Sequence, residues 1–130
     1  MLAALSFMLL PQCSKTVSPE VAASEAARQS YGHLLAGRYD QFLAARDGMD
    51  TISSAYHEQL VTAYKQFVAQ QRNAHGGINT FHVSRAAWME SPVDSTLRLM
   101  QVFLVLHYAD HTEEEIVVPM VERNGVWKIK

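Results

Sequence analysis

The histidines are the side chains of this 130-residue chain best suited to chemistry, and there are six of them. His82 and His107 fall within apolar, strand-like patterns, so we predict that both are buried. A buried histidine beside a carboxylate or a carbonyl can act as a general acid or base. A buried histidine is more often a hydrogen-bonded structural group, so His82 and His107 are alternative catalytic residues in our interpretation and not the favoured one.

The patterns that would hold a metal or a nucleophile are incomplete. His57-Glu58 begins like the zinc motif H-E-x-x-H, but Val61 stands where the second histidine is required. His107 and His111 flank a predicted turn with no cysteine nearby, which favours structural roles over zinc ligation. The candidate carboxylates all fall in or beside predicted turns: Asp40, Asp47, Asp50, Asp94 and Asp110. We therefore expect no metal and no cofactor, and we favour a non-enzyme.

The start of the chain has the pattern of an export signal. The apolar run Leu2 to Leu10 is shorter than the roughly 20 residues that a membrane span needs, and it suits a signal core of about 7–15 residues. It is followed by Cys13, the only cysteine, as in the lipobox of bacterial lipoproteins, which this segment resembles. Pro11 and Gln12 depart from the small residues usual before such a cysteine, and no basic residue precedes the run.

This resemblance implies that Cys13 is lipidated and becomes the mature N-terminus. We then expect a signal segment at 1–13, a short tether at 14–17, a membrane partner held through the lipid, and a location in the bacterial cell envelope, facing the periplasm or the surface. The alternative is that residues 1–12 form a buried first helix. Pro11 argues against that alternative, because proline disrupts a helix interior.

The remaining residues, 18–130, predict one domain, large enough to fold without a disulfide or a metal. The net charge is −2, and the basic residues are scattered. Nucleic-acid binding would lack its main electrostatic contribution, so we exclude it.

The first half of this domain has helical signals. Ser18-Pro19-Glu20 predicts a helix start, with serine as the cap and proline in the first turn, and this helix should run to about Ala36 and stop at Gly37. A short second helix should follow, and a long third helix is expected from about Ser53 to Asn73. The predicted apolar positions of these helices are Val21, Ala27, Tyr31, Leu34, Leu35, Tyr39, Phe42, Leu43, Ile52, Tyr56, Leu60, Tyr64, Phe67 and Val68.

The second half predicts four strands, at 78–89, 97–108, 115–123 and 126–130. Asn124-Gly125 is a strong signal for a tight hairpin turn. The acidic run Glu113-Glu114-Glu115 is expected at a solvated strand start. Helices followed by an antiparallel meander indicate an α+β domain.

Two short motifs carry a family resemblance. They are Ala36-Gly37-Arg38-Tyr39-Asp40, between the first two helices, and Gly125-Val126-Trp127-Lys128-Ile129, at the end. In this order of elements they resemble the small lipoproteins of unknown function in the nuclear-transport-factor-2-like (cystatin-like) superfamily. The resemblance implies a cone-shaped α+β fold, in which a curved sheet wraps around the long helix and often encloses a pocket. Such pockets serve isomerases, cyclases and dehydratases, and also non-catalytic binding domains.

The resemblance leaves three functional hypotheses. The first is a non-catalytic module that binds a small apolar ligand or a protein partner. The second is a pocket enzyme of the isomerase, dehydratase or hydrolase class that uses His82 or His107. The third is a dimeric structural subunit, a homodimer through a sheet face that exposes Arg98 and Gln101. The expected pocket-lining residues are Tyr31, Tyr56, Tyr64, Phe67, Trp88 and Met100.

Overall fold

The computed structural model describes residues 17–90 and 96–130. Three helices come first, α1 (Pro19–Leu35), α2 (Tyr39–Ala44) and α3 (Ser54–His75), with a short 3-10 turn, η1 (Met49–Thr51), before α3. Four strands follow: β1 (Ile78–Met89), β2 (Leu99–Tyr108), β3 (Glu113–Arg123) and β4 (Val126–Ile129). Cys13 and the predicted signal segment lie outside the described residues. Within the described ranges, no helix has the length and apolarity that a membrane span requires.

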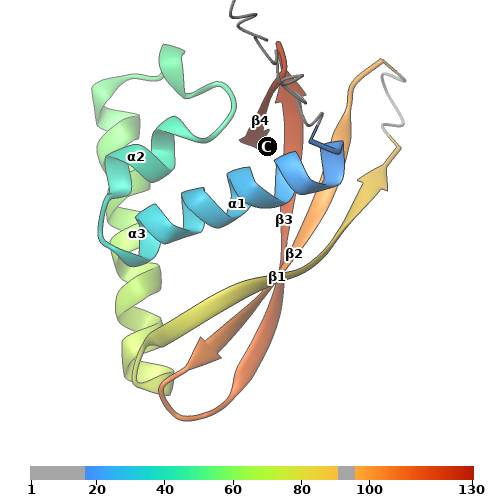
Figure 1. Cartoon of the computed structure of the whole chain (residues 1–130). Coiled ribbons are helices and arrows are strands. Elements are labelled where there is room, and N and C mark those ends of the chain that lie inside the picture. The colour runs from blue at the N-terminus through green and yellow to red at the C-terminus, as the bar shows by residue number, and fades with distance from the viewer. Residues whose placement is uncertain (1–16, 91–95) are drawn as a thin grey trace, which may run out of the picture.

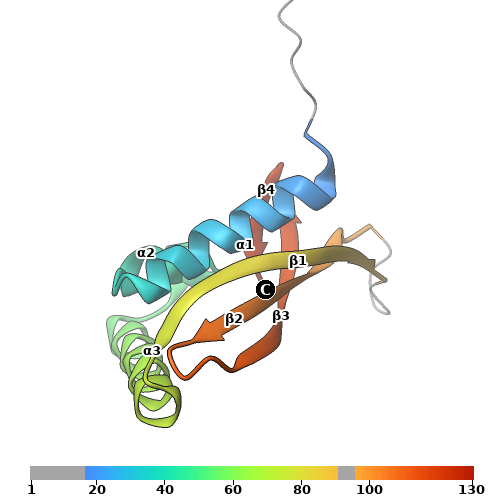
Figure 2. The same cartoon turned by 60° about the horizontal axis from the view of Figure 1, so that its bottom comes forward.

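The strands form one antiparallel sheet in the order β1-β2-β3-β4, so each strand pairs with its neighbour in sequence. The sheet is curved and twisted, and α1 crosses one of its faces (Figures 1 and 2). The predicted α+β architecture is therefore confirmed. β3 begins at Glu113, two residues earlier than expected, because Glu113 pairs with His107 and Glu114 with Leu106 in the ladder.

α1 starts and ends where its capping signals predict. The hydroxyl of Ser18 accepts a hydrogen bond from the Val21 backbone N–H at 3.3 Å, and Gly37 follows the helix with a φ of +77°. The residues that α1 buries are Ala23, Ala27, Ser30 and Leu34. Val21 is 57% exposed, so its predicted place on the apolar stripe is wrong.

The core lies between α1 and the sheet face that α1 covers. Met100, Val102 and Leu104 of β2 are completely buried there. Side chains from neighbouring strands and from the helices complete this core: Ala23, Ala27, Leu34, Phe42, Val118, Met120, Trp127 and Ile129. The alanines of α1 let its backbone approach the sheet closely, and the large side chains of the strands fill the space.

The long helix α3 does not occupy the centre of the fold, which corrects the expectation of a sheet wrapped around it. No residue of its 22 is buried, and it stands beside the sheet (Figure 1). Tyr64, Phe67 and Val68 pack partly against the core, whereas Tyr56 is 45% exposed. The apolar stripe of α3 therefore reaches the core around the middle of the helix, because α1 already covers the sheet.

Candidate functional site

The face of the sheet opposite α1 has no helix across it among the described residues, and we call it the open face (Figure 2). Side chains alternate between the two faces of a strand, so the register assigns them. The open face carries His82, Arg85, Phe103, Val105, His107, Glu115 and Val117. Val117 is 47% exposed on this face.

The two histidines that the sequence singled out lie side by side on the open face. Nδ1 of His82 on β1 is 2.8 Å from Nε2 of His107 on β2. His82 is exposed and His107 is half-buried, so the prediction that both are buried is wrong. The apolar neighbours of His82 and His107 in the sequence point to the core face, and the histidines themselves point away from it.

Glu113 fixes the arrangement of hydrogens in this pair. Its Oε1 lies 3.1 Å from Nδ1 of His107. An ionised carboxylate only accepts hydrogen bonds, so Nδ1 of His107 carries the hydrogen when that ring is neutral. Nε2 of His107 then accepts from Nδ1 of His82, and Nε2 of His82 is left with a lone pair. The relay Glu113–His107–His82 thus links three adjacent strands and ends in a basic nitrogen.

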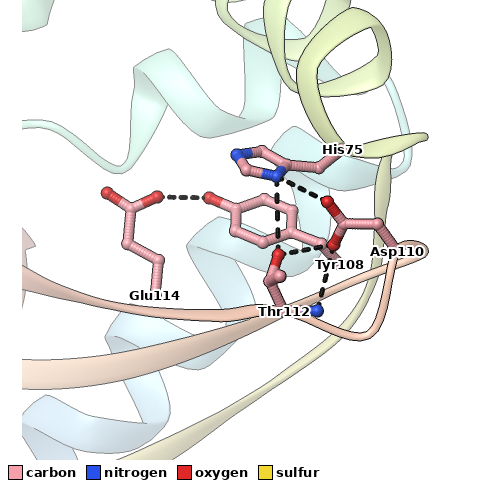
Figure 3. Close-up of polar contacts among 5 residues, drawn as sticks. All are labelled: His75, Tyr108, Asp110, Thr112 and Glu114. Carbon is pink, nitrogen blue, oxygen red and sulfur yellow. Dashed lines mark hydrogen bonds and ion pairs between the residues drawn. The ribbon is translucent and has the colours of Figure 1, made fainter.

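A second group of polar side chains lies at the same end of the sheet and is drawn in Figure 3. We call it the turn-end cluster, formed by His75, Tyr108, Asp110, Thr112 and Glu114. Nδ1 of His75 is 2.9 Å from the Asp110 carboxylate, and the His75 ring stacks on Tyr108 at 4.1 Å between centroids. The Tyr108 hydroxyl donates to Glu114 at 2.5 Å.

The turn-end cluster joins the end of α3 to the turn between β2 and β3. Gly76 and Gly77 let the chain leave α3, and the Ala109 backbone N–H donates to the Gly77 carbonyl at 2.9 Å. The Asp110 backbone N–H donates to the His75 carbonyl at 3.1 Å. Side-chain and backbone contacts therefore hold the same two segments together, as expected of a structural cluster.

Two ionisable groups of the turn-end cluster have displaced pKa values. The pKa of Asp110 falls to about 2, because its carboxylate accepts hydrogen bonds from the Thr112 side chain, from His75 and from the Thr112 backbone. The pKa of Tyr108 rises to about 12, chiefly through burial and then through its hydrogen bond to Glu114. Both shifts favour an ionised Asp110 and a protonated Tyr108 at neutral pH.

We expect Asp110 to stabilise the fold in a pH-dependent way. Its pKa of about 2 lies below the ordinary aspartate value of about 3.9. Its stabilising contribution is therefore complete above the ordinary value and is lost as the pH falls through the folded value. Urea unfolding should show Asp110→Asn less stable than the wild type at pH 5, and the difference should be much smaller at pH 2, where the Asp110 carboxyl is about half protonated.

The matched control is Asp50→Asn, which removes an exposed carboxylate from η1. It should leave the free energy of unfolding unchanged at both pH values. A difference between wild type and Asp110→Asn that is as large at pH 2 as at pH 5 would show that ionisation of Asp110 does not stabilise the fold.

An open pocket of about 380 Å³ lies between the relay and the turn-end cluster. The residues that line it include His107, Tyr108, Thr112 and Glu113. These residues bring hydrogen-bond acceptors, a phenol and imidazoles to the pocket. Such groups suit proton exchange or the binding of a polar group. In the described parts of the chain, no three histidine, cysteine or carboxylate side chains are grouped closely enough to hold a metal ion.

The structure places the six predicted pocket-lining residues in different surroundings. Met100 is completely buried, and Tyr31, Phe42 and Tyr64 form edge-to-face contacts at 5.4 and 4.8 Å. Phe67 packs on the core, and Tyr56 points outward. Trp88 is half exposed, and its indole N–H donates to Glu20 at 2.9 Å.

Arg98 and Gln101 do not share a sheet face, contrary to the prediction. The Arg98 guanidinium lies 5.1 Å from the centroid of the Trp88 ring and pairs with Glu122 at 3.2 Å. Trp88 is opposite Met100 in the ladder and so belongs to the face that α1 covers. Gln101 is one position further along β2 and points to the open face, because side chains alternate along a strand.

Comparison with known proteins identifies the fold. No protein-family model matches the chain, and no curated protein matches it. A matching crystal structure is that of a Campylobacter jejuni protein described as an "NTF2-like transpeptidase", with a TM-score of 0.61 and 8% sequence identity. The match covers 81% of this chain and 94% of that one. The chain therefore has the nuclear-transport-factor-2-like fold, as the sequence resemblance implied.

Proposed function

We propose that this protein is an envelope lipoprotein, tethered through a lipidated Cys13, whose domain is a non-catalytic binding module. The signal-like run Leu2 to Leu10 before a single cysteine supports the tether. Two or more acyl chains would hold the protein stably on a membrane, whereas one chain binds only marginally. The domain would then act at the membrane surface.

The observation that carries the binding role is the filled core beneath α1. Met100, Val102 and Leu104 are completely buried against the helix, so a small apolar ligand has little room there. The His82–His107 pair, which an enzyme would need inside a closed pocket, lies on the open face. This arrangement favours binding through an exposed surface rather than catalysis in a cavity. A protein partner is therefore favoured rather than a small apolar ligand.

The open face suits a second copy of this chain. The Arg85 guanidinium lies flat over Phe103, at 3.7 Å from the ring centroid, and Arg and aromatic residues are enriched in interfaces. Arg85 and Glu115 are on the same face, from β1 and β3, with opposite charges. A self-complementary two-fold interface between open faces can pair Arg85 of each copy with Glu115 of the other.

The tether is tested by the intact mass of the protein from its native membrane, compared with a Cys13→Ala version. We expect the wild-type chain to begin at Cys13 with the mass of two or three added acyl chains, and to remain with the membrane fraction. Cys13→Ala should lack the added mass and leave the membrane. A full-length, unmodified wild-type mass in the soluble fraction would refute the tether.

The binding face is tested by light scattering after size exclusion, on the full chain carrying Cys13→Ala. We expect the mass of a dimer at concentrations of tens of micromolar, and Val117→Glu should give the mass of a monomer, because it buries an unpaired charge in the interface. Val21→Glu is the matched control, since Val21 is exposed to a similar extent on α1, and should remain dimeric. A monomeric parent chain, or a dimeric Val117→Glu, would refute pairing through the open face.

A further inference from the structure

We propose that His82 and His107 form a copper site, in which the two imidazoles hold one Cu²⁺ ion at the edge of the open face. This inference does not depend on the lipid tether or on pairing of the domains. The two rings come from adjacent strands of the sheet, and their facing nitrogens, Nδ1 of His82 and Nε2 of His107, are 2.8 Å apart. Two imidazoles on adjacent strands can both bind one ion once it displaces the hydrogen bond that joins them.

Glu113 gives the pair a feature typical of metal-binding histidines. Such histidines usually donate their second ring N–H to a carboxylate or a carbonyl, which orients the ring and increases its basicity. Nδ1 of His107 makes this contact with Glu113 at 3.1 Å. Nε2 of His107 is thereby turned toward His82 with a lone pair, which accepts the hydrogen bond from Nδ1 of His82 until an ion takes its place.

The ion would replace the hydrogen that the two rings share. For Nδ1 of His82 to become a ligand, that hydrogen moves to Nε2 of the same ring. His82 is exposed, so water can accept a hydrogen bond from Nε2. No proton needs to be released, because His82 stays neutral, and the charge of the ion is partly balanced by Glu113 across the His107 ring.

The intrinsic affinities of the metal ions decide which ion is expected. The observed 2.8 Å is the length of the hydrogen bond that joins the two rings, so both rings must turn before their lone pairs can converge on one ion. Cu²⁺ binds such nitrogen sites most tightly among the divalent first-row ions, so it is the expected occupant.

The site has two protein ligands, and water would fill the other positions. No third histidine, cysteine or carboxylate joins the pair at ligand distance in the part of the chain that the structure describes. The affinity should accordingly be modest, and each imidazole should contribute a large share of it. Removal of either imidazole should therefore lower the Cu²⁺ affinity strongly, which tests the proposal.

The experiment is a Cu²⁺ titration by calorimetry, with electron paramagnetic resonance of the loaded protein. The full chain carries Cys13→Ala, because a free thiol would bind and reduce copper. We expect one Cu²⁺ per chain, a spectrum with two nitrogen ligands, and an affinity for Zn²⁺ at least tenfold weaker. His82→Gln and His107→Gln should each lower the Cu²⁺ affinity at least tenfold, and Glu113→Gln should lower it about tenfold.

His57→Gln is the matched control, because His57 also faces a carboxylate, that of Asp40 at 3.4 Å, but has no second imidazole there. It should leave the Cu²⁺ affinity unchanged, with circular dichroism confirming that all variants are folded. An equal loss in His57→Gln, or a loss in His75→Gln or His111→Gln that His82→Gln does not show, would overturn the proposal. A spectrum without two nitrogen ligands would do the same.

Discussion

Replacing Leu104 with alanine is expected to lower the free energy of unfolding by about 2–5 kcal/mol, the usual cost of emptying a leucine site in a core. Leu104 is completely buried in the middle of β2, where it faces α1 between Val83 of β1 and Ile116 of β3. Strands on both sides and a helix above prevent the site from collapsing easily. Urea unfolding, followed by circular dichroism, measures the difference.

Val117→Ala is the matched control, because it shortens an apolar side chain on the opposite face of the same sheet. Val117 is half exposed, so its truncation should change the free energy of unfolding by no more than about 0.5 kcal/mol. The measurement should be made at low protein concentration, so that pairing of open faces does not contribute. Equal losses in the two variants would contradict the assignment of one covered and one open face.

Replacing Gly76 with alanine is expected to destabilise the protein by about 1–2 kcal/mol, because Gly76 ends α3 with a φ of +78°. An added Cβ would also meet the Cβ of Ala109 at 3.2 Å, in the turn that the His75–Asp110 contact holds. The substitution therefore strains the backbone and the junction of α3 with the sheet. Thermal and urea unfolding of the variant would both report the loss.

Gly32→Ala is a control for which we expect the opposite change in the free energy of unfolding. Gly32 lies inside α1, and nothing is within 4 Å of the position that a Cβ would take. Alanine stabilises a helix interior relative to glycine by about 0.5–1 kcal/mol. A stabilised Gly32→Ala beside a destabilised Gly76→Ala would show that the loss at Gly76 comes from its left-handed conformation and its close contact with Ala109, and not from replacing glycine as such. Destabilisation by Gly32→Ala would contradict it.

The boundaries of most elements could be predicted because local chemistry sets them. Ser18 caps α1 and Ser53 caps α3 through their hydroxyls, and Gly76 ends α3. Asn124 and Gly125 turn the last hairpin with positive φ values of 51° and 80°. Each signal acts within a few residues and needs no knowledge of the rest of the fold.

The candidate site could be predicted only in part. The sequence pointed to His82 and His107 but not to their contact, which depends on strand register. Irregularities in the pairing between Ile78 and Thr80, and between Val83 and Arg85, set which β1 residues face each side. The His75–Asp110 pair was missed, although a helix-terminal histidine and the pattern Asp-x-Thr in a turn were visible signals. No local sequence signal indicates that the side chains of His75 and Asp110 are in contact.

The sequence by itself determined the order and kind of the elements and the α+β class, because caps, turn residues and apolar periodicity act locally. It also placed Cys13 behind a signal-like run. Only the tertiary structure decided that α1, and not the longer α3, covers the sheet, and hence that His82 faces solvent. Burial depends on which helix packs on which face of the sheet. α1 covers the sheet because the small residues along it let its backbone lie close to the strands.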